Sequence, residues 1–503
     1  MPRCISRELK TLSVWALTFT LSGCIGTGGI APQGEALPAN RLATDAAIRE
    51  AARDARWPAR QWWKAYGDLQ LDRWIDLAMQ DSPSLAMAAA RVRQAKALAG
   101  MVEAAESLQV NAEATLKRHN WPTDQFYGPG ELANTTTWDN NAGLGLSYAL
   151  DLWGRERNAS ERAVDLAHMS VAEGRQAQLE LQNNIVQAYI RFSLHYAQRD
   201  IVVATLRQQE QILQLAQKRL DGGIGTHFEV SQAQAPLPET HRQLDALDEA
   251  IALSRNQLAA LAGKGPGEGS SLQRPTLVLG APLKLPSALP AELLGQRPDV
   301  VAGRWQVAAQ ARGIDVARAG FYPNVDLVGS IGYMATGGGA LEFLTGKKLT
   351  YSVGPAVSLP IFDGGRLRAQ LGEAAAGYDV AVAHYNRTLV NALKSISDQL
   401  IRRQSMDKQQ AFAGESVAAA QRTYDIAMVA FQRGLTDYLN VLNAQSLLFK
   451  QQQVQQQVSA ARLSVHADLV TALGGGLEAG GDVPQAAETR AARVPAILSA
   501  LDH

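Results

Sequence analysis

The chain has 503 residues, of which 46% are hydrophobic and 19% are charged, and its 48 basic residues equal its 48 acidic ones. This balance leaves no basic excess for a phosphate backbone, so nothing in the charge suggests nucleic-acid binding. The only two cysteines, Cys4 and Cys24, lie near the amino terminus, so the body of the chain has neither a disulfide nor a thiolate metal site.

The amino terminus has the pattern of a secretion leader. Three basic residues, Arg3, Arg7 and Lys10, precede an apolar run over 11–21. That run is too short to cross a bilayer, so residues 1–23 are predicted to be a signal peptide that is removed.

The leader ends in Leu21-Ser22-Gly23-Cys24, which resembles a bacterial lipobox. Cleavage at a lipobox precedes the cysteine, whose sulfur is then acylated, so the sequence predicts a covalent lipid on Cys24. The alternative is an ordinary signal peptide with an incidental cysteine. Ile25 follows in place of the Asp of an inner-membrane retention signal, which favours the outer membrane.

The rest of the chain repeats itself. Three landmarks recur in order at offsets of 215, 209 and 211 residues: Ser82-Pro83 with Arg297-Pro298, Leu152-Trp153-Gly154 with Ile361-Phe362-x-Gly364, and Gly223 with Gly434. Spacing held this closely indicates a duplicated architecture. Each half is predicted to contain a strand hairpin followed by two long helices.

Four segments alternate apolar and polar residues, at about 108–119, 138–150, 324–333 and 351–360. Their lengths are close to the roughly 9–11 residues of a tilted transmembrane strand, and one face of each is apolar. A soluble antiparallel sheet with one dry face has the same period. Because the smallest transmembrane barrels have about 8 strands, four strands require further copies of the chain, and three copies give twelve.

The helices are predicted at about 84–105, 155–221, 226–261, 299–319, 364–433 and 436–473. At about 1.5 Å per residue the two longest span on the order of 100 Å, which is too long for a compact core. Apolar residues recur three and four apart along them, which indicates coiled-coil packing; a simple structural coiled coil is the alternative. Pro236 and Pro238 should kink the helix at 226–261 or delay its start.

Six motifs carry a resemblance to a known family. They are WWKAYGDLQLDRWIDLAMQDSPSLAMAAARV (62–92), LDLWGR (150–155), RPDVVAGRWQV (297–307), FYPNVDL (321–327), LPIFDGGR (359–366) and GLTDYLNVLNAQ (434–445). In this order they resemble the TolC-like outer-membrane efflux factors, specifically the NodT-type lipoprotein branch. The similarity covers about Trp57 to Leu473.

The resemblance implies a membrane β-barrel plus an α-helical barrel, with four strands and long coiled-coil helices per protomer and an internal two-fold repeat. A homotrimer then forms a twelve-strand barrel and a twelve-helix tunnel. The implied division is 1–23 signal peptide, 24–74 anchor and equatorial segment, 75–262 first repeat, 263–295 equatorial segment between the repeats, 296–473 second repeat and 474–503 tail. The implied partners are outer-membrane lipid, a periplasmic adaptor and an inner-membrane pump of the resistance-nodulation-division type, with no cofactor besides the lipid.

The resemblance also places a periplasmic gate and adaptor contact at the two helix turns. The candidate residues are Gly223, Thr226, Glu229, Arg433, Gly434, Thr436, Asp437, Asn440 and Asn443. Family members often carry Asp where this chain has Asn440 and Asn443, so a carboxylate ring is not carried over to these positions. Our hypothesis is that opening breaks contacts between protomers near Asp437, Asn440 and Arg433, with Arg433 or Glu229 pairing across the turns.

The sequence contains no H-E-x-x-H, P-loop, G-x-S-x-G or dinucleotide fingerprint, so we expect no enzyme. The favoured function is the outer-membrane channel of a drug-efflux system. Two alternatives remain, the outer-membrane conduit of a type I protein secretion system and a periplasmic coiled-coil lipoprotein that only acts as a spacer. Metal-ion efflux is less favoured, because Met and His form no clusters along the predicted lumen.

Overall fold

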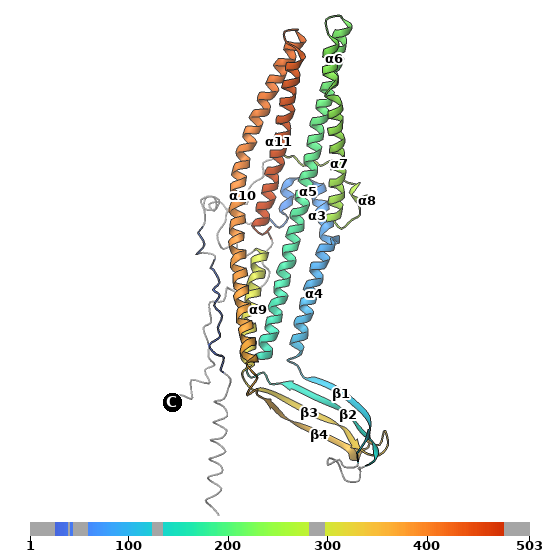
Figure 1. The fold of residues 1–503 in the computed structure, drawn as a ribbon, viewed down its shortest axis with the longest axis vertical. Helices are drawn as coiled ribbons and strands as arrows, with labels where there is room; N and C mark the ends of the chain where they lie inside the picture. The colour runs from blue at the N-terminus through green and yellow to red at the C-terminus, as the bar shows by residue number, and fades with distance from the viewer. Residues whose placement is uncertain (1–25, 39–40, 44–58, 123–133, 281–296, 477–503) are drawn as a thin grey trace, which may run out of the picture.

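The computed structural model describes residues 26–38, 41–43, 59–122, 134–280 and 297–476. The molecule is elongated, with a strand sheet at one end and long helices running away from it (Figure 1). Two helices of 67 residues set its length, α5 (Arg155–Asp221) and α10 (Arg366–Gln432). At about 1.5 Å per residue each spans roughly 100 Å.

Shorter helices pack along these two. The helix α4 (Pro83–Ala104) lies on α5, and α9 (Pro298–Ala319) lies between α5 and α10 in the half nearest the strands (Figure 1). In the other half α7 (Leu237–Leu261) returns along α5, and α11 (Tyr438–Ala472) returns along α10. The remaining pieces are α3 (Leu69–Asp81), α6 (His227–Gln234), α8 (Pro266–Gly269) and the 3₁₀ turns η2 (Trp62–Tyr66) and η5 (Gly346–Lys348).

The sequence predicts one helix over 226–261, and the structure divides it into α6 and α7. The break falls at Ala235-Pro236, because Pro236 has no amide hydrogen to donate and its ring crowds the preceding turn. Pro238 lies in the first turn of α7, where a missing amide hydrogen has no helical partner to lose. The helix α3 spans residue 74, the last residue of the expected equatorial segment.

The four strands are β1 (Gln109–Asn120), β2 (Thr136–Ala149), β3 (Asn324–Thr336) and β4 (Leu349–Ser358). They form one antiparallel sheet in the order β1-β2-β3-β4. The third strand is longer than its predicted end at 333, since it pairs with β2 as far as Thr336 opposite Asp139. Each hairpin leads directly into a long helix. The two repeats meet in the sheet where β2 pairs with β3.

A core at mid-height packs η2 and α3 against α5, α7 and α11. Its polar centre is Asp68, which is only 2% exposed. The Asp68 carboxylate accepts hydrogen bonds from the Gln70 and Leu71 amides at the start of α3, from the Tyr189 hydroxyl on α5, and from the amides of Thr276 and Leu277. One side chain therefore joins three segments that are far apart in the sequence.

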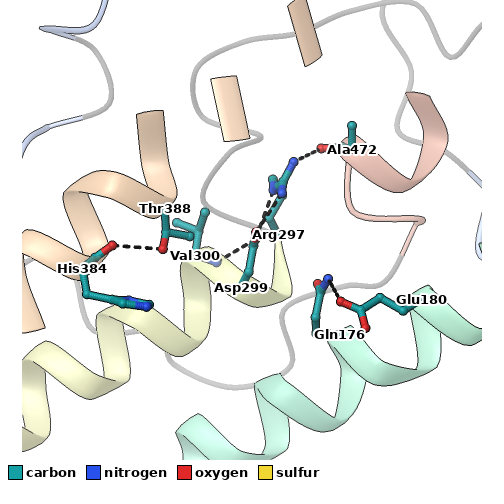
Figure 2. A network of polar contacts seen from close by, with 8 residues as sticks. All are labelled: Gln176, Glu180, Arg297, Asp299, Val300, His384, Thr388 and Ala472. Carbon is teal, nitrogen blue, oxygen red and sulfur yellow. Dashed lines mark hydrogen bonds and ion pairs between the residues drawn. The ribbon is translucent and has the colours of Figure 1, made fainter. Parts of the chain in front are cut away.

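Arg297 forms a second link, between the start of α9 and the end of α11 (Figure 2). Its guanidinium donates to both oxygens of Asp299, at 3.0 and 2.7 Å, and to the carbonyl of Ala472 at 2.5 Å. Asp299 also accepts from the Val300 amide. The Arg-Pro-Asp sequence thus starts α9 and attaches the end of α11 to it.

An extended arm, residues 26–38, lies along α10 (Figure 1). The Asp379 carboxylate accepts from the amides of Gln33 and Gly34, and the Asn386 side chain accepts from the Leu37 amide and donates to the Glu35 carbonyl. At the strand end of the arm, Arg368 donates to the carbonyl of Gly26. The arm therefore follows α10 from its first turn toward mid-height.

We predict that Asp68→Ala destabilises the mid-height core by roughly 3 kcal/mol or more, because several buried donors lose a charged acceptor together. Thermal unfolding followed by circular dichroism measures the change. Asp76→Ala is the matched control, since Asp76 is exposed on the same helix. Equal unfolding temperatures for the two variants would contradict the role of Asp68.

Candidate functional site

The sheet has one apolar face. In the observed register Ala112, Leu144, Ile331 and Tyr351 lie side by side across the four strands, as do Val110, Leu146, Gly329 and Val353. Tyr351 is 77% exposed and Val353 is 78% exposed in the single chain. Exposed apolar surface in continuous rows, on strands of 10–14 residues, is typical of a face that contacts lipid.

The opposite face is small and polar. Asn111, Gly145, Ser330 and Ser352 form one row, and the hydroxyls of Ser330 and Ser352 are 2.8 Å apart. In the next row Gly143 and Gly332 are partners, and a Cβ built on Gly332 would lie 2.5 Å from the Ala142 carbonyl oxygen. Only glycine allows this close approach of the two strands.

The sheet ends on β1 at one side and β4 at the other, and neither has a second strand partner among the described residues. Unpaired edges in an apolar surrounding leave backbone donors and acceptors without partners. In such a surrounding both edges of the described sheet need further strands as partners.

At the far end of the molecule two helix turns lie together (Figure 1). In the first, Gly223 has φ +71°, and the Ile224 amide donates to the Arg219 carbonyl at 3.0 Å. In the second, Gly434 has φ +74°, and the Leu435 amide donates to the Ala430 carbonyl at 2.9 Å. Both are Schellman ends, in which glycine takes the left-handed conformation that closes the helix.

Each returning helix is capped by predicted site residues. Thr226 accepts from the Glu229 amide while the Glu229 carboxylate accepts from the Thr226 amide, which is a capping box. In the second turn Asp437 accepts from the amide of Asn440. The Asn440 side chain also donates to Asp437 and to the hydroxyl of Thr436, at 2.9 and 2.7 Å.

The structure thus groups the predicted residues within each turn and not across the two turns. Within the described part of the chain, no ion pair joins Glu229 or Arg433 to the other turn. Arg433 and Asn443 are exposed. Cys24 lies outside the described residues.

A core that sequence reasoning missed joins the two hairpins. The Arg219 guanidinium of α5 lies 5.2 Å from the ring centre of Phe431 on α10, and the Phe431 ring packs against Tyr438 of α11 at 5.9 Å. Burial and the nearby Tyr424 raise the pKa of Tyr438 to about 12. Phe431 and Tyr438 lie seven residues apart across the turn, and two aromatics at that spacing were the available signal.

In the described residues, no helix is both long enough and apolar enough to cross a membrane. No cluster of three or more His, Cys, Asp or Glu side chains in this part of the chain is placed to hold a metal ion.

Comparison with known proteins identifies a family and several relatives that this chain resembles. Residues 74–264 and 289–475 match the family described as "Outer membrane efflux protein". The fusaric acid resistance protein FusA of Burkholderia cepacia is 45% identical over 477 residues, which is 94% of this chain and 89% of FusA. The multidrug resistance outer membrane protein MdtP of Escherichia coli K12 is 29% identical, covering 95% of this chain and 99% of MdtP.

Among solved structures, the outer membrane protein VceC of Vibrio cholerae superimposes with a TM-score of 0.77. It is 34% identical, and the match covers 84% of this chain and all of that one. This chain matches FusA in sequence over 94% of its length and VceC in fold over 84% of its length. The chain belongs to the outer membrane efflux protein family.

Proposed function

We propose that this outer-membrane efflux protein is the passive channel of a tripartite efflux system. As a homotrimer it carries small molecules from an inner-membrane pump of the resistance-nodulation-division type and a periplasmic adaptor, through the periplasm and across the outer membrane. The observation that carries the proposal is the four-stranded sheet with an apolar face and two unpaired edges. Three chains supply twelve strands, which exceeds the roughly 8 strands of the smallest closed barrels.

The helices extend the same conduit. Four helical rods per chain, α5, α6 with α7, α10 and α11, make a tunnel of twelve when three chains assemble. A conduit of this kind acts through its shape and the charge of its walls, so it performs no bond chemistry and needs no cofactor. A periplasmic spacer would leave the apolar strand face without a role.

The relatives support small molecules as cargo. FusA is named for resistance to fusaric acid and MdtP for multidrug resistance. These names favour drugs and other small organic compounds over secreted proteins for this chain.

The chain divides by role in this proposal. Residues 75–262 and 296–473 are the two repeats that build barrel and tunnel. The segments 24–74, 263–295 and 474–503 form an equatorial belt, which the core around Asp68 supports because it joins α3 to residues 276–277.

The two helix turns form the periplasmic gate and the adaptor contact. Ile224 and Leu435 occupy the same position in the two turns and are 72% and 76% exposed. Two apolar side chains presented on well-capped turns suit docking of an adaptor's apolar tip. In this proposal the exposed charges of Arg433 and Asp437 meet neighbouring protomers, while Gly223 and Gly434 allow the tight turns.

Cys24 carries a covalent lipid in this proposal. The arm supports it, because Gly26 lies against Arg368 in the first turn of α10, beside the strand end of the molecule. A lipid near that point inserts into the same membrane as the apolar strands.

We predict that Asp437→Asn combined with Arg433→Gln opens the gate. Asn caps a helix about as well as Asp, so the substitution removes the charge and keeps the start of α11. Three copies of an exposed ion pair shift the open-to-closed ratio by roughly 3-fold to 100-fold. Single-channel recording of the purified protein in planar bilayers measures this ratio.

The control for the gate is Asp425→Asn, which removes an exposed carboxylate on α10 away from the turn. It should leave the open probability unchanged. If the double variant behaves like this control, Arg433 and Asp437 do not hold the gate.

We predict that the wild-type mature chain begins at a lipid-bearing Cys24 and that Cys24→Ala abolishes lipid attachment. The variant should still reach the outer membrane as an assembled channel, because the strands insert independently of the anchor. Intact-mass measurement of the purified protein decides the point. Cys4→Ala is the matched control and should keep the lipid, and an unmodified Cys24 in the wild type would refute the assignment.

A further inference from the structure

A cavity of about 870 Å³ lies where the strands meet the helices. It is enclosed by the strand-side ends of α5, α9 and α10 and by the connections that leave the sheet. Asn324 and Ser358, which are partners in the β3–β4 register, line it, and both continue the polar face of the sheet. The cavity therefore opens on the polar side, which is the lumen side in the proposed conduit.

The arm supports the same orientation. Arg368, Asp379 and Asn386, which hold the arm, are spaced eleven and seven residues apart and so share one side of α10. Glu373 and Gly377, which line the cavity, lie on the other side of the helix. In the proposed trimer the arm, which leads to the lipid on Cys24, takes the outer side of α10, so the cavity takes the inner side.

Three guanidinium groups line the cavity, those of Arg155, Arg162 and Arg366. The Nε atom of Arg162 is enclosed and has no hydrogen-bond partner in the described part of the chain. Two carboxylates oppose them, Asp151 and Glu373. Three cationic and two anionic side chains therefore line the cavity; outside its wall, the Arg155 guanidinium lies 3.7 Å from the Glu156 carboxylate.

An aromatic pair completes the wall. The rings of Trp153 and Tyr322 stack with centroids 4.7 Å apart and planes at 17°. The Trp153 indole donates to the Pro323 carbonyl at 2.8 Å, which fixes its orientation. Both rings line the cavity and keep part of their surface exposed, so they offer a flat apolar surface beside the arginines.

We infer that this cavity is a binding site for planar aromatic organic anions on their way through the lumen. A carboxylate pairs with guanidinium groups in a forked geometry while its ring lies against the Trp153–Tyr322 pair. Three copies facing one lumen form a ring of arginines, and rings of arginine favour anions in a pore. The inference rests on the proposed function and adds a substrate class to it.

The test uses the full-length protein in planar bilayers, with salicylate as the probe, added on the side of the barrel mouth so that it need not pass the helix turns. Salicylate should block the current of the wild type. Arg155→Gln/Arg162→Gln/Arg366→Gln should raise the half-blocking concentration about tenfold or more, the loss expected when charge-assisted hydrogen bonds are removed. The reversal potential in a salt gradient should also shift toward cations.

Two comparisons make the result specific. Benzylammonium, which has a similar ring and the opposite charge, should block less than salicylate in the wild type. Arg155→Gln should weaken salicylate block, whereas Arg157→Gln should not, because Arg157 lies on the other side of α5 and does not line the cavity. If the triple variant does not assemble, the comparison of Arg155→Gln with Arg157→Gln tests the inference by itself.

The inference is overturned if salicylate block is the same in the wild type and the arginine variants, or if benzylammonium blocks more strongly. A wild-type protein that forms no conducting pore contradicts the proposed function itself. Conduction without arginine-dependent block contradicts only the cavity assignment.

Discussion

The structure depends on one constraint: the sheet cannot be satisfied by a single chain. Its apolar face presents side chains such as Tyr351 and Val353 that water solvates poorly, and β1 and β4 each leave a row of backbone groups unpaired. In a lipid surrounding, unpaired backbone groups cost several kcal/mol each, so the edges must be closed by other strands. Insertion of the sheet into the membrane therefore requires assembly with further strands.

The helices follow from how each hairpin ends. Gly154 and Gly365, with φ of +74° and +92°, turn the chain from the sheet into α5 and α10. Both helices then begin with an arginine, Arg155 and Arg366, although a helix N-terminus disfavours cations. The same exception occurs at equivalent positions in both repeats, and both arginines line the cavity between the strands and the helices.

The far helix turns and the mid-height region are held together by different interactions. The far turns depend on backbone caps and on an apolar core around Phe431 that joins the two hairpins. The mid-height region depends on Asp68 and Arg297, whose hydrogen bonds join segments that are distant in sequence.

The sequence by itself determined the duplication, the strand and helix types, and the family, because these rest on local periodicity and on motifs such as LPIFDGGR that are read directly. It also placed Thr226 and Asp437 in the two helix turns, and the structure adds that they cap α6 and α11. Only the tertiary structure decided which residues meet across segments: Asp68 with Thr276, Arg219 with Phe431, and the arginines of α5 and α10 around one cavity. Such contacts depend on the relative rotation and register of long helices, and no pattern within one helix fixes these.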